Sequence, residues 1–297
     1  MSTTVGRLSL PAPVMTASGT AGHGVELSGY GPLSSLGAVV VKSLSAIPWA
    51  GNPAPRVHPA SGGGMVNHVG LQGPGVAPWR QEQLPALVSC GARVVASIWG
   101  RTVEEFAAAA ALLAGAPGVV AVEVNVSCPN LDDGRRMFAT SAAATGEAVA
   151  AAAAAGLPRW AKLSPAVSDL CEIAGAALDA GAEALTLVNT LPAAGVDIVQ
   201  GRRWSGGLSG PPLHPVAVRA VRDCRQAFAG AGIVGVGGVA SGEDAVELLQ
   251  MGADAVQVGT AIFADPRAPW KVQEGVARWC RRHGVTAVRE VVGAALR

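Results

Sequence analysis

Eight short runs of apolar, mostly β-branched residues recur along this chain, and segments rich in Ala, Leu, Glu and Arg separate most of them. Continuous apolar strands that alternate with helices are typical of a parallel sheet covered on both faces. Eight such units predict an α/β fold, a (β/α)8 TIM barrel, because a doubly wound sheet usually has fewer strands. The strand-like runs are residues 13–17, 38–42, 93–98, 119–126, 160–163, 184–188, 233–236 and 255–258. The clearest helix-like segments are residues 103–113, 169–180, 215–228 and 242–250.

Composition favours one globular unit that acts on small molecules. The chain has 297 residues, of which 50% are hydrophobic and 14% charged, so it can bury a large core. No linker rich in Pro, Gly or Ser and no run of charge divides it, and we expect a single barrel domain over residues 1–297. Lys and Arg together number 22 and Asp and Glu 21, which argues against a nucleic-acid surface.

The cysteines and the hydropathy pattern indicate a cytoplasmic protein. The 5 cysteines are widely spaced and form no CxxC pair, which is typical of free thiols in a reducing compartment and predicts no zinc or iron-sulfur site on this chain. The N-terminus lacks a long apolar leader, and no stretch reaches the roughly 18 apolar residues of a membrane span. We therefore expect a soluble cytoplasmic location, with no metal and no membrane contact.

Polar residues follow several of the apolar runs. Because strand ends meet at the C-terminal face of a barrel, we expect these side chains to converge there. Any one of them alone is equally consistent with a hydrogen-bonded core residue. Long loops after strands two, four and six should surround them, since residues 43–78 and 190–214 are too long for simple turns. The polar residues are Lys42 and Ser43 after the second run, Asn125 and Cys128 after the fourth, Lys162 in the fifth, and Asn189 and Thr190 after the sixth.

The segment NVSCPN at residues 125–130 holds a candidate base. Cys128 stands between Asn125 and Asn130, and a thiol in this position can exchange a proton. Each amide offers both a donor and an acceptor to a planar substrate with amide-like edges. The alternative is that Cys128 is a small buried hydrophobe beside a strand end.

Glycines follow the last two strands. Gly237 and Gly238 come after the seventh run, and Gly259 and Thr260 after the eighth. Backbone N–H groups at these two strand ends form the usual phosphate site of this barrel. A phosphorylated cofactor fits better than a phosphorylated substrate, because the lysines and amides lie on the other strands.

Ten segments in a fixed order resemble one family over nearly the whole chain. That family is class 1 dihydroorotate dehydrogenase, and the NAD-linked 1B catalytic subunit is a better match than the fumarate-linked 1A form. The segments are TASGT at 16–20, VKSL at 41–44, GNP at 51–53 with PR at 55–56, NHVGLQ at 67–72, NVSCPN at 125–130, KLSP at 162–165, LTLVNTL at 185–191, GGLSGP at 206–211, GVGG at 235–238 and QVGT at 257–260.

The resemblance implies a flavoprotein that oxidises (S)-dihydroorotate to orotate in the biosynthesis of UMP. It implies that Cys128 takes the proton from C5 while hydride passes from C6 to N5 of FMN. The implied substrate contacts are Lys42, Asn67, Gly70, Leu71, Asn125, Asn130, Asn189 and Thr190. The implied FMN contacts are Ser18, Lys42, Ser43, Asn125, Lys162, Val188, Gly210, Gly237, Gly238, Gly259 and Thr260.

The resemblance also implies where the electrons go. In the 1B form they pass to a partner subunit that carries FAD and an iron-sulfur cluster, and then to NAD; a fumarate-linked enzyme is the alternative. We expect a homodimer or, with that partner, a heterotetramer. Two other functions stay open: a related FMN oxidoreductase acting on another pyrimidine, and a non-catalytic flavin-binding paralogue.

Three residues depart from the family pattern. Ser97 stands where the family usually has an asparagine that contacts the flavin, and His23 where it commonly has an aromatic residue. His68 replaces a small residue in the substrate loop. These departures put one FMN contact and the choice of pyrimidine in question.

Overall fold

The fold is built on a parallel sheet. The structure is a computed structural model that describes residues 1–127 and 138–297. Within those residues, 8 parallel strands pair in the order β3-β14-β13-β10-β9-β8-β7-β4. Each strand overlaps one of the predicted runs, so the prediction of the eight strands is confirmed. Their bounds are β3 Val14–Thr16, β4 Val39–Val40, β7 Val94–Ile98, β8 Val119–Asn125, β9 Arg159–Leu163, β10 Ala184–Leu187, β13 Gly232–Val236 and β14 Ala255–Val258.

Hydrogen bonds between the first and last strands of that order close the sheet. Gly37 N–H donates to Val14 O at 2.8 Å, and Thr16 N–H donates to Ala38 O at 3.3 Å. The Thr16 hydroxyl accepts the N–H of Val40 at 2.9 Å. β3 and β4 are therefore joined although they share no regular ladder, and the predicted TIM barrel is confirmed.

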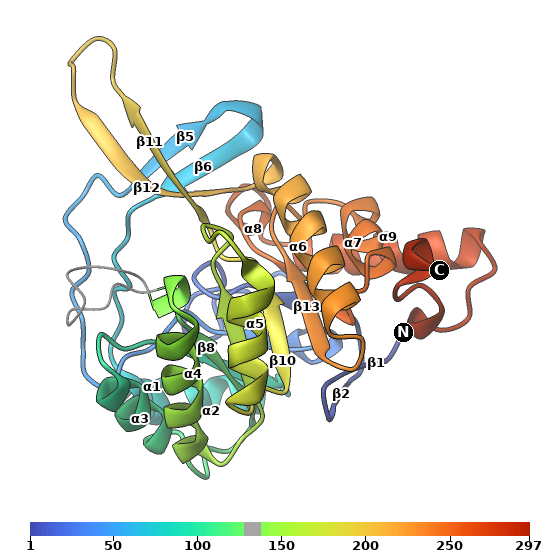
Figure 1. The fold of residues 1–297 in the computed structure, drawn as a ribbon, viewed down its shortest axis with the longest axis horizontal. Helices are drawn as coiled ribbons and strands as arrows, with labels where there is room; N and C mark the ends of the chain where they lie inside the picture. Colours follow the sequence, from blue (N-terminus) through green and yellow to red (C-terminus); the bar gives the residue numbers. More distant parts are fainter. Residues whose placement is uncertain (128–137) are drawn as a thin grey trace.

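Helices cover the outside of the barrel, and α3 to α7 follow one another around it (Figure 1). Four of them begin at a side chain that accepts a backbone N–H of the first turn, namely Thr102, Ser141, Asp169 and Ser241, which is why they start where they do. None of the helices in the described part of the chain is long and apolar enough to cross a membrane. Their bounds are α1 Val76–Glu82, α2 Leu84–Ser89, α3 Val103–Ala111, α4 Ala142–Ala151, α5 Leu170–Asp179, α6 His214–Ala227, α7 Gly242–Gln250, α8 Ala261–Ala264 and α9 Ala268–Arg282.

The N-terminal end of the barrel is closed by apolar packing. A hairpin of β1, Thr3–Val5, and β2, Leu8–Leu10, precedes the barrel. Its Val5 and Leu10 belong to the same buried cluster as the barrel residue Trp160, which is 0% exposed. We did not predict this hairpin from the sequence. Because this hairpin closes the N-terminal end of the barrel, we expect the ligand site at the C-terminal end.

A small antiparallel sheet lies over the C-terminal end of the barrel (Figure 1). Its strands come from the two long connections predicted to follow the second and sixth barrel strands, and the connections pair with each other through Gly207 and Asn67. The predicted loop after the fourth strand falls largely on residues 128–137, outside the described residues. The strand order in the described part is β11-β12-β6-β5, with bounds β5 Val57–Ala60, β6 Gly64–Asn67, β11 Leu191–Val196 and β12 Arg203–Ser209.

Candidate active site

A cavity of about 450 Å³ lies at the C-terminal ends of the barrel strands, beneath the antiparallel sheet. This volume is in the range of small-molecule sites. The candidates Cys128 and Asn130 lie outside the described residues, and Ser127, next to Cys128 in sequence, lines the cavity. The other sequence-predicted site residues all line it too, although they come from distant parts of the chain: Ser18, Lys42, Ser43, Asn67, Gly70, Leu71, Asn125, Lys162, Val188, Asn189, Thr190, Gly210, Gly237, Gly238, Gly259 and Thr260.

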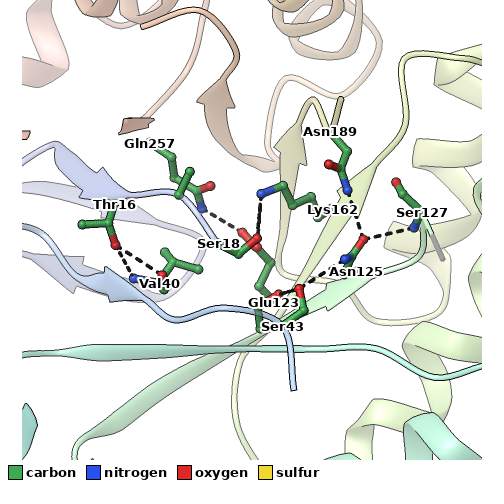
Figure 2. A network of polar contacts seen from close by, with 12 residues as sticks. Thr16, Ser18, Val40, Ser43, Glu123, Asn125, Ser127, Lys162, Asn189 and Gln257 are labelled. Carbon is green, nitrogen blue, oxygen red and sulfur yellow. Dashed lines mark hydrogen bonds and ion pairs between the residues drawn. The ribbon is translucent and has the colours of Figure 1, made fainter. Parts of the chain in front are cut away.

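Asn125 is the centre of a network of amides and hydroxyls (Figure 2). Its Oδ1 accepts the Nδ2 of Asn189 at 3.1 Å and the N–H of Ser127 at 3.2 Å. Its Nδ2 donates to Ser43 Oγ at 3.2 Å. The Asn189 Oδ1 accepts the N–H of Thr190 at 2.8 Å. Side chains at the ends of three strands are thus held in place before any ligand binds.

Ser97 supports this network from below and does not line the cavity. It lies on β7 at 0% exposure, and its hydroxyl is 2.9 Å from Ser43 Oγ. The departure from the family pattern therefore puts a short hydroxyl beneath Ser43, and Ser43 lies at the cavity wall.

Replacing Ser97 by alanine should lower the free energy of unfolding by about 1 kcal/mol, because one buried hydrogen bond is lost. Urea unfolding of the flavin-free protein measures this change. Ser28→Ala, at an exposed position, is the control and should leave the stability unchanged. Equal stability of the Ser97→Ala variant and the unmodified protein would mean that the bond to Ser43 contributes nothing.

Two lysines give the cavity wall positive charge. Burial lowers the pKa of the Lys42 ammonium below its usual value, and the nearby positive charge of Arg56 lowers it further. Lys162 is 4% exposed, and its Nζ donates to Ser18 Oγ at 3.1 Å and lies 3.5 Å from Glu123 Oε1. An anionic ligand would be attracted to both ammonium groups.

Glu123 and Gln257 were not among the predicted site residues. Glu123 is 0% exposed, and its Oε2 accepts the Nε2 of Gln257 at 2.7 Å. The sequence does contain a signal for it, because Glu123 is the one charged residue in the otherwise apolar run at 119–124. A charge inside a buried strand requires a partner, and Lys162 is that partner.

The substrate loop predicted at residues 67–72 is clamped by the segment before it. Gly70 has a φ of +75°, and a Cβ there would lie 2.6 Å from Asn52 Cγ. Trp49 Nε1 donates to Gly70 O at 3.0 Å, and Arg56 Nη1 donates to Gln72 Oε1 at 2.5 Å. The two segments that carry the resemblance here, GNP with PR and NHVGLQ, are therefore parts of one packed unit.

The two histidines that depart from the family pattern lie at different depths. His68 lines the cavity, and its backbone is held by Arg56 and Asn52. His23 does not line the cavity. Burial lowers the pKa of His23, and the charge of Lys42 lowers it further against the opposing effect of Glu26.

Backbone groups form part of the cavity wall at the ends of β13 and β14. Gly238 has a φ of +72°, and a Cβ there would lie 2.6 Å from His214 Cβ. His214 Nδ1 donates to Gly237 O at 2.9 Å, and its Nε2 lies 3.0 Å from Glu247 Oε2. The glycine backbone thus lies close against α6, where no side chain separates its N–H groups from a ligand. Such a surface suits a phosphate group.

The donor set suits a planar anion and a phosphorylated cofactor better than a metal. Apolar side chains also line the cavity and offer a flat ring a contact surface, namely Val188, Leu213 and Val236. No group of three or more metal-ligating side chains is present in residues 1–127 and 138–297. The cavity therefore combines a phosphate cradle, an apolar wall, ammonium groups and amides.

Comparison with known proteins agrees with this combination. The family model described as dihydroorotate dehydrogenase matches residues 1–279. The chain is 41% identical over 299 residues to a protein of Geotalea uraniireducens, covering 99% of this chain and 97% of the relative. It is 42% identical over 299 residues to proteins of Trichlorobacter lovleyi and of Pelobacter propionicus, covering 99% of this chain and 98% of each relative. All three relatives are named dihydroorotate dehydrogenase B (NAD(+)), catalytic subunit.

Proposed function

The chain belongs to the dihydroorotate dehydrogenase family, and on that basis we propose that it oxidises (S)-dihydroorotate to orotate in pyrimidine biosynthesis, with FMN as its cofactor. One observation carries the proposal: a single cavity brings together two lysines, a network of amides and a glycine cradle. We propose that residues 1–297 act as one FMN-binding barrel domain.

FMN fits the residues of this cavity. Gly237, Gly238, Gly259 and Thr260 would hold the phosphate, because their backbone is open to the cavity. Lys162 would place positive charge beside the ring, where it stabilises the reduced, anionic form. When bound, FMN accepts the hydride that leaves the substrate. The remaining proposed contacts are Ser18, Lys42, Ser43, Asn125, Val188 and Gly210.

The amide network suits the substrate. The ring of dihydroorotate has alternating N–H and C=O groups, which amide side chains can match on both edges. Lys42 would bind the substrate and lie against the flavin. The backbone at Gly70 and Leu71 would border the substrate in the clamped loop. The amides and hydroxyl proposed to bind it are Asn67, Asn125, Asn130, Asn189 and Thr190.

Cys128 is the proposed base. An ordinary thiol has a pKa of about 8.5, which is close enough to the working pH for proton abstraction next to a carbonyl. A serine hydroxyl would need more activation. Ser127 already borders the cavity, so the chain reaches the substrate region immediately before Cys128.

The electrons would leave through another protein. The relatives are named as catalytic subunits of NAD(+)-linked enzymes, which supports a partner subunit for this chain. We propose that this partner carries FAD and an iron-sulfur cluster and passes the electrons to NAD. The proposed assembly is a homodimer that joins two partner subunits in a heterotetramer. The chain without a partner should then reduce its flavin but not NAD.

Anaerobic titration of the FMN-loaded protein tests the function. Dihydroorotate should bleach the flavin absorbance, and orotate should perturb the spectrum whereas uracil and thymine should not. Bound FMN that dihydroorotate does not bleach would indicate a non-catalytic paralogue. A response to uracil or thymine but not to orotate would indicate another pyrimidine substrate, and His68 at the cavity wall would be the first residue to examine.

A further inference from the structure

Two buried charges form a pair inside the barrel, one at the cavity wall and one beneath it. Lys162 lines the cavity, whereas Glu123 is 0% exposed and does not. The distance from Lys162 Nζ to Glu123 Oε1 is 3.5 Å. In the β8–β9 ladder Asn125 is opposite Lys162. Glu123, two residues earlier on the same face of β8, therefore lies one step deeper in the barrel.

Each member of the pair has a further partner that orients it (Figure 2). Gln257 Nε2 donates to Glu123 Oε2 at 2.7 Å, and Lys162 Nζ donates to Ser18 Oγ at 3.1 Å. The barrel interior toward the N-terminal end is apolar and includes Trp160. In the described part of the chain, Glu123 and Lys162 are the charged side chains that are buried. Each is therefore the other's buried counter-charge there.

Fold stability alone does not account for this pair. The loss of hydration of two charges offsets most of their attraction, and apolar residues of similar size usually stabilise a core equally well. The location of the pair points to the ligand instead. Lys162 borders the cavity, and charges in an interior with little water are weakly screened. A carboxylate at this distance therefore changes the field that a ligand beside Lys162 experiences.

We propose that Glu123 is a positioning residue that sets how much positive charge Lys162 presents to the bound flavin. The inference rests on the proposed function, in which Lys162 lies beside the flavin ring. A positive charge there stabilises the reduced anion. The Glu123 carboxylate opposes that effect and holds the ammonium toward the barrel interior. It thereby keeps the reduction potential of the flavin lower than it would be if Lys162 had no counter-charge.

The test is the midpoint potential of FMN bound to the full-length protein. Glu123→Gln removes the charge with little change in shape and should shift the potential upward by about 30 mV or more, which corresponds to a roughly tenfold change in the equilibrium constant of a two-electron couple. Glu123→Asp keeps the charge but draws it away from Lys162, and should give a smaller upward shift. Because the Asp variant retains a carboxylate for Gln257 and Lys162, it tests the inference even where the Gln variant does not fold.

Glu183→Gln is the matched control. Glu183 is partly exposed, pairs with Arg7 and lies at the N-terminal end of β10, far from the cavity; its loss should not move the potential. Lower stability of both Glu123 variants with unchanged potentials would assign Glu123 a structural role and overturn the inference. Failure of the unmodified protein to bind FMN would overturn the proposed function itself, and the inference with it.

Discussion

Replacement of Cys128 by alanine should slow the reduction of bound flavin by dihydroorotate by about 10²- to 10⁴-fold, the usual contribution of a positioned acid or base. The physical reason is that none of the cysteines in the described residues lines the cavity, so no other thiol there could take the substrate proton. Stopped-flow measurement of flavin bleaching under anaerobic conditions gives the rate. FMN affinity should stay within about threefold of the unmodified protein, because the loss concerns proton transfer and little binding energy.

Cys90→Ala is the control for this experiment. Cys90 is an exposed free thiol that caps α2 at the outside of the barrel, so its loss should change neither the rate nor the affinity. Cys128→Ser should retain part of the activity at high pH, because a larger fraction of the hydroxyl is ionised there. A Cys128→Ala variant with unchanged reduction rate would remove Cys128 from the mechanism and return it to a packing role.

Replacement of Gly238 by alanine should weaken FMN binding by about 100-fold. The added Cβ would lie 2.6 Å from His214 Cβ. Overpacking of this kind destabilises the structure by about 1–3 kcal/mol. The φ of +72° adds about 1 kcal/mol of strain for any residue with a side chain. The backbone must shift to relieve both, which moves its N–H groups away from the phosphate. Quenching of FMN fluorescence on titration of the flavin-free protein measures the affinity.

Gly156→Ala is the control that shows whether backbone strain away from the cavity weakens FMN binding. Gly156 has a similar φ of +66°, but a Cβ there would meet nothing within 4 Å, and it does not line the cavity. This variant should be slightly less stable and bind FMN normally. If both glycine variants lost FMN affinity equally, the effect would come from general destabilisation, and the glycine wall would not be the phosphate site.

The barrel strands were predictable because each is a local run of apolar residues. The apolar character of those residues already indicates that the strand is buried. The positions of Lys42, Asn125 and Asn189 were predictable for a related reason. All parallel strands of a barrel end at one face, so polar residues that follow them meet there. The segments LPAAGV and RWSGGLS gave no such signal, since Gly, Ala and Pro are poor strand formers. They become β11 and β12 because the hairpin also pairs with β6, about 140 residues away in the chain.

The sequence by itself determined the barrel, because strands and strand ends follow from periodicity along the chain. Its ordered motifs, through their resemblance to one family, determined the family and the described residues that line one cavity. Only the tertiary structure decided which of these residues act on one another. The bond from Ser97 to Ser43, the closure of the barrel floor by β1 and β2, and the pairing of Glu123 with Lys162 and Gln257 all join distant segments. Such contacts depend on the register and tilt of strands, which bring side chains within a few ångströms in ways that spacing along one strand does not encode.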